Sequence, residues 1–214
     1  MRLVAFLAKT LARLDAPAVA PDPALPPVVL VHGIRSNGDD MERLAQHLRS
    51  QAREVFQPTL TPNSGIAPIG KLAEQLADFV SEKIGARRFD LVGFSMGGLV
   101  SRVFLQRLGG IERVHRFVTM ATPHNGTHMA RLGGRPGYVE MRPGSEFLRD
   151  LARDADVLRA IPFTSLYTPL DTVIVPASSS VVPQARNVRV WAATHPSFVL
   201  ERRCIRAVAA ALRE

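Results

Sequence analysis

Apolar residues recur along the chain with two different spacings. Short apolar runs, typical of buried strands, separate longer stretches in which apolar residues return every three or four positions, as on one face of a helix. The runs that predict strands are 28–31, 55–60, 89–94, 114–120, 163–168 and 187–192, and the stretches that predict helices are 40–53, 66–84, 96–108, 145–160 and 197–212. Strands that alternate with helices in this way predict an α/β fold, with about six mainly parallel strands and helices on both faces of the sheet.

The first 27 residues lack this alternation. Residues 1–14 place apolar side chains on one helical face opposite basic ones, which suits packing on the domain or binding to a membrane surface, and we favour packing. A secretory leader is disfavoured because Lys9 and Arg13 interrupt the apolar run. The remaining residues before the first strand are rich in Pro and Ala and predict an extended linker. We therefore expect an amphipathic segment and linker over 1–27 and one domain over 28–214.

The composition limits which binding partners and which cellular locations we expect. The chain has 214 residues and a net charge of +8, carried almost wholly by arginines that are scattered along the sequence. Without a dense basic run beside aromatic residues we expect no nucleic-acid partner, and peripheral contact with an anionic membrane is the alternative to a solvated surface. The only cysteine, Cys204, lies on the apolar face of a predicted helix and is expected in the core. We expect a cytoplasmic protein, with a peripheral membrane or secreted one as alternatives, and leave the oligomeric state open.

The segment Gly93-Phe94-Ser95-Met96-Gly97 stands where the predicted strand 89–94 gives way to the predicted helix 96–108. The G-x-S-x-G pattern is weak evidence by itself, but a strand, sharp turn and helix around it are typical of a nucleophile elbow. Small residues at Gly93 and Gly97 would let neighbouring backbone pass close to the turn. The sequence therefore predicts Ser95 as a catalytic nucleophile.

A serine nucleophile needs a histidine base, and that histidine needs an acid to orient it. In this arrangement the chain order is Ser, acid, His. Asp171 follows the strand 163–168 within a short turn, and His195 follows the strand 187–192, so both are expected at the carboxyl edge of the sheet, where ligands bind in such folds. We predict a triad of Ser95, His195 and Asp171.

Other acids and histidines fit these roles less well. The other candidate acids after Ser95 are Glu140, Glu146, Asp150, Asp154 and Asp156. Most of them lie on a predicted helix, where a solvated carboxylate is the default. The competing histidines precede the acid or lie within predicted elements: His47, His115, His124 and His128. His32, in the turn after the first strand, is expected to make structural hydrogen bonds. Asp39 and Asp40 precede a helical stretch and are explained as helix caps, so no metal or cofactor is predicted.

The backbone around the nucleophile predicts where the oxyanion and the acyl group would bind. One amide donor comes from the residue after the nucleophile, Met96, and the other from the loop after the first strand, at Ile34. Phe94, Leu99 and Met129 are predicted as substrate-binding wall residues.

Three segments carry a resemblance to a known family: Val-His-Gly at 31–33, Gly-Phe-Ser-Met-Gly-Gly-Leu-Val-Ser-Arg at 93–102 and Ala-Thr-Pro-His-Asn-Gly-Thr at 121–127. On these the chain resembles the α/β-hydrolase superfamily, and within it the bacterial lipase and esterase group related to GPI inositol-deacylase-like proteins. The resemblance implies an α/β-hydrolase fold in which the loop 121–127 borders the acyl pocket. The segment 122–162 is short for a multi-helix lid, which implies a minimal lid or none.

We expect a serine carboxylic ester hydrolase, an esterase or lipase that cleaves apolar acyl esters of a small molecule or lipid through an acyl-enzyme on Ser95. An acyltransferase or a thioesterase would use the same triad. From a different class, the alternative is a non-catalytic module that binds membrane surfaces through its basic residues.

Overall fold

The computed structural model describes residues 19–214 and is built around one parallel sheet. The predicted amphipathic segment 1–14 lies outside the described residues. The six strands of the sheet within 19–214 are β1 (Val28–Val31), β2 (Val55–Phe56), β3 (Phe89–Phe94), β4 (Val114–Met120), β5 (Phe163–Tyr167) and β6 (Arg186–Arg189). They lie in the order β2-β1-β3-β4-β5-β6, and every neighbouring pair is parallel. The predicted six-stranded parallel sheet is confirmed.

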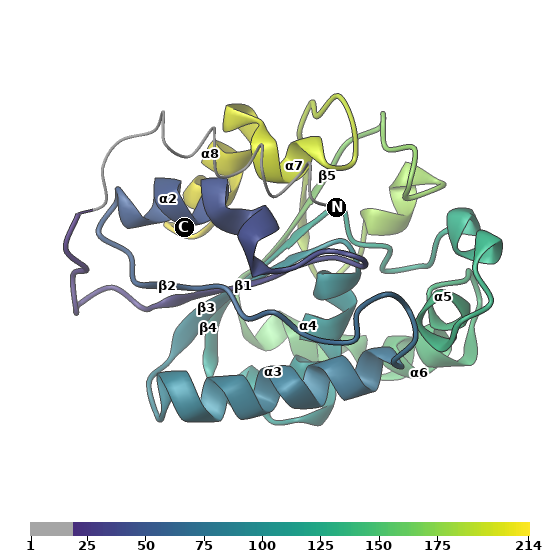
Figure 1. Ribbon diagram of the computed structural model, residues 1–214, viewed down its shortest axis with the longest axis horizontal. Coiled ribbons are helices and arrows are strands. Elements are labelled where there is room, and N and C mark those ends of the chain that lie inside the picture. Colours follow the sequence, from purple (N-terminus) through teal and green to yellow (C-terminus); the bar gives the residue numbers. More distant parts are fainter. Residues whose placement is uncertain (1–18) are drawn as a thin grey trace.

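Helices cover both faces of this sheet (Figure 1). One face carries α2 (Glu42–Arg49), α7 (Ser197–Leu200) and α8 (Arg202–Ala211), and the other carries α3 (Ile69–Ile84), α4 (Met96–Arg107) and α6 (Glu146–Arg153). Successive strand residues point to opposite faces, so Leu91 packs with the α3 and α4 cluster and Val92 with the α2 and α8 cluster. Two apolar layers thus form the core, and Cys204 lies fully buried in one of them.

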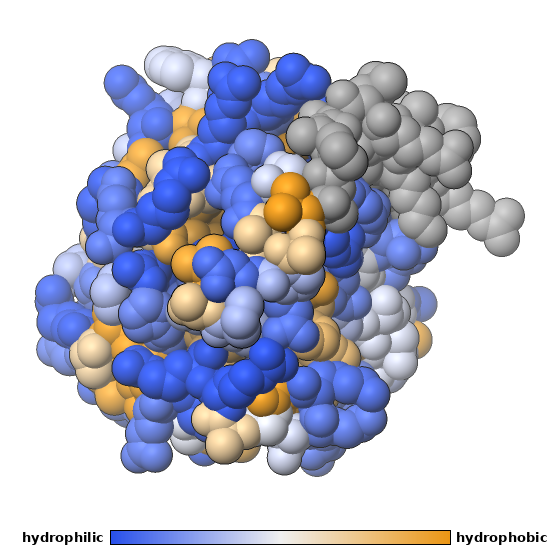
Figure 2. Space-filling model, turned by 90° about the vertical axis from the view of Figure 1, so that its left-hand side faces the viewer, coloured by the Kyte–Doolittle hydropathy of each residue, from blue (hydrophilic) through white to orange (hydrophobic). Residues whose placement is uncertain are grey.

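Shorter elements lie between these strands and helices along the chain. These are α5 (Pro136–Glu140) and the 3₁₀ turns η1 (Gly38–Met41), η2 (Gly110–Glu112), η3 (His128–Leu132), η4 (Ala155–Ala160) and η5 (Ala177–Ser180). No helix within residues 19–214 has the length and apolar character needed to cross a bilayer. Hydrophilic side chains, with apolar ones between them, cover the end of the molecule opposite α5 (Figure 2).

Several predicted boundaries differ from the observed ones for local reasons. The predicted strand 55–60 ends at Phe56, and Pro58 beyond it has no N–H to donate to a sheet. The predicted helix 197–212 breaks at Glu201, whose backbone is extended and whose carboxylate accepts from the amide of Ala193. The predicted helical stretch 145–160 divides into α6 and η4, and Ser145 caps α6 by accepting from the amide of Leu148.

The strand order reverses its direction between β1 and β3. The chain moves outward from β1 to β2, and from β3 onward it moves across the sheet in the other direction. At such a switch point the loops that follow the two strands diverge, leaving room for a ligand at the carboxyl edge. Here those loops begin with His32 and Ser95.

Candidate active site

Ser95 lies in a strained turn between β3 and α4. Its φ of 54° and ψ of −125° are unusual for a residue with a side chain, and its amide donates to the carbonyl of Met120 over 2.8 Å. A Cβ on Gly97 would stand 2.3 Å from the carbonyl oxygen of Val31, and one on Gly93 would stand 2.6 Å from Cα of Gly98. The predicted need for glycine at both positions is confirmed, because no larger residue fits against this backbone.

Asp171 and His195 form a buried hydrogen-bonded pair. His195 Nδ1 lies 2.8 Å from Asp171 Oδ2, and the two residues are 7% and 8% exposed. Asp171 Oδ1 accepts from the amides of Val173 and Ile174, at 2.8 and 2.9 Å. Because the carboxylate accepts at Oδ2, the proton of a neutral His195 belongs on Nδ1, which leaves Nε2 as an acceptor.

Phe94 connects this pair to the serine turn. The ring of Phe94, the residue before Ser95, packs against the His195 ring with centroids 4.9 Å apart. On the other side, a Cβ on Gly33 would stand 3.1 Å from Ser95 Cβ, so the loop after β1 closes directly over the serine. The sequence-predicted residues from β1, β3, β5 and β6 are therefore gathered at one edge of the sheet.

The two predicted oxyanion donors have no competing acceptor. Within residues 19–214 the amides of Ile34 and Met96 donate to no protein group, although the neighbouring amides of Arg35 and Gly98 are bonded to Asn63 and Ser95 carbonyls. Met96 opens α4, where the first amides of a helix have no intrahelical acceptor. These amides can stabilise negative charge next to Ser95.

The three predicted wall residues lie in different surroundings. Phe94 is 8% exposed and contacts His195, as described above. Leu99 is fully buried among the α3 and α4 side chains, whereas Met129 is 39% exposed on η3. Of the three, Met129 offers the most surface to a bound molecule.

The competing histidines either bond other residues or lie away from Ser95. His32 accepts from the amide of Leu60 at Nε2 and bonds the Gly33 carbonyl through Nδ1, as the sequence predicts for a structural residue. Burial lowers the pKa of His32. His47 and His115 lie on α2 and β4, beside Gln51 and Asp90, and His128 is exposed at the start of η3.

Most of the competing acids also have partners away from the serine. Glu140 accepts from the amide of Ile69, and burial raises the pKa of its carboxyl group. Asp150 and Asp154 both pair with Arg107, and Asp156 pairs with Arg159. Asp40 accepts from Ser36 Oγ and the amide of Asn37 at the start of η1, in keeping with its predicted capping role. Among residues 19–214 no group of three or more His, Cys, Asp or Glu side chains could hold a metal ion.

Sequence reasoning missed the polar residues that hold this edge of the sheet together. Thr168, the residue after β5, donates to the carbonyl of Ala192 over 3.1 Å and accepts from the amide of Leu170. It thereby joins the start of the Asp171 loop to the start of the His195 loop. A threonine directly after a strand, three residues before the predicted acid, is the signal that could have identified it.

A second missed group surrounds His124, a buried residue of the loop that follows β4. His124 Nε2 lies 3.0 Å from Thr119 Oγ1, which donates to Ser165 Oγ, which donates in turn to the Ser180 carbonyl. Burial and the nearby Arg102 charge hold the pKa of His124 well below its usual value. His124 is therefore a neutral structural residue that ties β4, β5 and η5 together.

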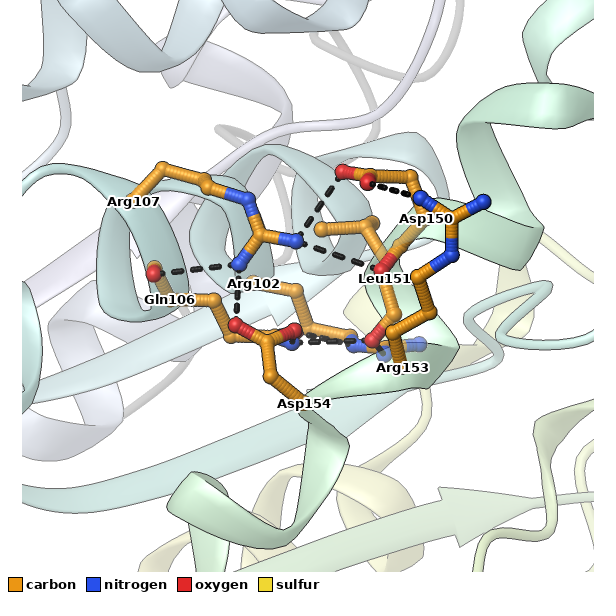
Figure 3. A network of polar contacts seen from close by, with 7 residues as sticks. All are labelled: Arg102, Gln106, Arg107, Asp150, Leu151, Arg153 and Asp154. Carbon is orange, nitrogen blue, oxygen red and sulfur yellow. Dashed lines mark hydrogen bonds and ion pairs between the residues drawn. The ribbon is translucent and has the colours of Figure 1, made fainter.

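Arg102, a buried cation on α4, anchors α6 and the loop that contains His124 (Figure 3). Its guanidinium donates to the Leu151 carbonyl over 2.8 Å and to the His124 carbonyl over 3.5 Å. Gln106 donates to the same Leu151 carbonyl, and Arg107 pairs with Asp150 and Asp154. These bonds fix α6 on α4.

Known proteins share this fold. The structure of a Bacillus licheniformis lipase, BlEst2 in its mature form, matches 92% of this chain and 96% of its own with a TM-score of 0.72 at 20% identity. Aspergillus fumigatus lipase B matches 94% of this chain and 55% of its own, with a TM-score of 0.77 at 19% identity. Both agreements confirm the predicted α/β-hydrolase fold.

Sequence comparison gives a family. Palmitoyl-protein thioesterase 3 of Dictyostelium discoideum is 27% identical over 115 residues, which are 51% of this chain and 39% of that protein. The chain thus spans well under half the length of this curated relative. The sequence profile of the palmitoyl protein thioesterase family matches residues 27–138, just over half of the chain, including the serine turn. The chain belongs to the palmitoyl protein thioesterase family.

Proposed function

We propose that this protein is a serine hydrolase that cleaves apolar acyl esters through an acyl-enzyme on Ser95. Ser95 Oγ attacks the carbonyl carbon of the substrate, and its proton passes to Nε2 of His195. Asp171 holds the imidazole by Nδ1 and stabilises the charge that develops on it. The observation that carries this proposal is the buried His195 and Asp171 pair, packed against the residue that precedes the strained serine.

The amides of Ile34 and Met96 stabilise the negative oxygen of the tetrahedral intermediate. The imidazolium then gives its proton to the leaving alcohol or thiol, and the acyl group stays on Ser95 Oγ. Water, activated by the same His195 nitrogen, releases the carboxylic acid and restores the serine. An alcohol in place of water would give acyl transfer with the same groups.

The second candidate function is hydrolysis of a long-chain acyl thioester. Membership of the palmitoyl protein thioesterase family and the name of the Dictyostelium relative favour it. The chemistry on Ser95 is unchanged, because only the leaving group differs, a thiol in place of an alcohol. The two candidates therefore share one nucleophile and differ in substrate preference.

Turnover of matched oxyesters and thioesters tests both candidates. Acyl groups from acetyl to palmitoyl would be offered as p-nitrophenyl esters and as thioesters, with the wild type beside Ser95→Ala. Ser81→Ala is the matched control, since Ser81 is exposed near the end of α3, which leads into the amino end of β3. We expect both activities to vanish in S95A and to persist in S81A.

The ratio of thioester turnover to ester turnover at each acyl chain length then assigns the substrate class. A preference for palmitoyl thioesters over palmitoyl esters supports the thioesterase, and the reverse supports the esterase or lipase. Full activity in a folded S95A variant would refute the proposed nucleophile.

A further inference from the structure

Apolar and basic side chains lie together on the segment that follows the loop 121–127. On η3 and α5, Met129, Leu132 and Val139 are 39%, 81% and 40% exposed, and Leu132 is the most exposed large apolar residue within 19–214. Arg131, Arg142 and Arg149 lie on the same short stretch of chain. We call these six residues the apolar and basic surface.

A shallow groove gathers several members of this surface. Arg131, Val139 and Arg142 line it together with 143–146, and Arg149 reaches it by donating to the Gly144 carbonyl over 2.6 Å. Arg131 has no ion-pair partner among the described residues, and Arg142 donates only to the Gly133 carbonyl. Two arginines therefore line this groove, and a third is hydrogen-bonded to one of its residues.

Negative charge on this surface is sparse. Glu146 is the one carboxylate among the groove residues, and the nearby Glu140 is half-buried and accepts from the amide of Ile69. The groove thus carries an excess of positive charge beside exposed apolar side chains. A flat partner that presents anionic groups above an apolar layer matches this combination, and a phospholipid bilayer has that structure.

This surface adjoins the candidate active site. The amide of His128, which opens η3, donates to the Val175 carbonyl, and Thr127 Oγ1 donates to the Val173 carbonyl, at 2.8 and 2.6 Å. Val173 also donates its amide to Asp171. The surface is therefore hydrogen-bonded to the loop that holds the predicted triad acid, at the carboxyl edge of the sheet (Figure 1).

We propose that the apolar and basic surface docks on anionic phospholipid bilayers, with Leu132 entering the acyl region and the arginines contacting lipid phosphates. Docking in this orientation brings the Ser95 edge of the sheet to the membrane, where apolar acyl substrates are concentrated. Binding itself does not depend on the proposed hydrolase function, so the two proposals can fail separately.

Vesicle binding by the full chain tests the proposal without any turnover. Sedimentation with phosphatidylcholine vesicles that contain about a quarter phosphatidylserine would compare the wild type with Leu132→Ser and Arg131→Gln, singly and together. The matched control is Leu108→Ser with Arg206→Gln, which makes the same chemical changes at the end of α4 and on α8. Circular dichroism and thermal denaturation would show that each variant is folded.

We expect R131Q to lower the vesicle partition coefficient about fivefold and L132S about tenfold, and the control pair to bind like the wild type. Wild-type binding should weaken on vesicles of phosphatidylcholine alone and in high salt. The proposal is overturned if the wild type does not bind anionic vesicles. It is also overturned if L132S with R131Q binds as the wild type does, or if the control pair loses binding equally.

Discussion

The histidines of the core show how single residues set the response of this protein to acid. Burial lowers the pKa of His32 and holds that of His124 well below its usual value, so both stay neutral in the folded chain as the pH falls. In the unfolded chain each takes up a proton near pH 6.5. The unfolded state therefore binds more protons below that pH, and folding stability is present above it and is lost as the pH falls.

We predict that His124→Gln weakens the pH dependence of unfolding. Below about pH 6.5, the neutral His124 should lower the free energy of unfolding as the pH falls, with a slope of up to about 1.4 kcal/mol per pH unit. Urea denaturation at several pH values measures this slope. H124Q should have a shallower slope than the wild type, even though its stability at neutral pH falls from the lost bond to Thr119.

The control for this prediction is His128→Gln, because His128 is exposed at the start of η3. H128Q should keep the slope of the wild type. Equal slopes for H124Q and the wild type would contradict the assignment of a neutral buried histidine.

At the level of single residues, sequence reasoning identified groups whose place is fixed by strand ends. Ser95, Asp171 and His195 each follow a strand, so parallel strands bring them to one edge. His124 also follows a strand closely, but the loop that contains it folds so that its side chain is buried. The apolar and polar pattern of the neighbouring residues does not indicate this burial. The hydrogen bonds of Thr168 depend on how close the Asp171 loop lies to the His195 loop. The spacing of apolar residues along the sequence does not give that distance.

At the level of elements, the contact between α4 and α6 depends on a few polar side chains (Figure 3). Arg102 is buried, and burial lowers its pKa to about 10, so it remains charged at neutral pH. It donates to main-chain carbonyls of two segments, whereas Arg153 on α6 is largely exposed and pairs only with Asp150. Arg102 therefore joins α6 to α4, whereas the Arg153 pair lies within α6 and provides an exposed comparison.

We predict that Arg102→Met loosens α6. The aliphatic stem is retained, but three bonds from a charged donor are lost, those to the Gln106 side chain and to the Leu151 and His124 carbonyls, while Gln106 still bonds the Leu151 carbonyl. The free energy of unfolding should fall by about 1.5 kcal/mol. Hydrogen exchange of the α6 amides, 146–153, should accelerate about tenfold, as expected for a local opening stabilised by that amount.

Arg153→Met serves as the control for this contact, since exposed ion pairs contribute less than about 1 kcal/mol. It should leave stability and α6 exchange near the wild-type values. Similar effects of R102M and R153M, or faster exchange spread over the whole chain, would show that Arg102 does not hold α6 in particular.

Element boundaries were less predictable than element types. The apolar pattern of 197–212 is continuous, yet the helix breaks at Glu201 because a side chain from the helix bonds the preceding loop. The stretch 131–137 contains Gly and Pro, a composition typical of a loop, yet Pro136 begins α5. Proline suits the first turn of a helix as well as a loop, so composition alone does not separate the two.

At the scale of the whole molecule, the sequence pattern was sufficient for the sheet and for the edge where the site lies. Alternating strands and helices predict a parallel sheet, and the order β2-β1-β3-β4-β5-β6 then places the loops after β1 and β3 at the switch point, where ligands bind in such folds. The apolar and basic surface was not predictable, because exposure of Leu132 and Val139 depends on how η3 and α5 pack.

Membership of the palmitoyl protein thioesterase family agrees with the strained Ser95 turn, the buried His195 and Asp171 pair and the two unbonded amides. Together these features make a single serine the centre of the proposed chemistry. A covalent bond to that serine is therefore the central claim of the account.

Reaction with a fluorophosphonate probe tests this claim most directly. Ser95 Oγ would displace fluoride from phosphorus, with its proton passing to His195, and the adduct would be located by mass spectrometry of tryptic peptide 89–102. Fragment ions should place the adduct on Ser95 and not on Ser101, the other serine of that peptide, and S95A should not react. An adduct on another residue, or no adduct on a protein that turns over acyl esters, would contradict the account.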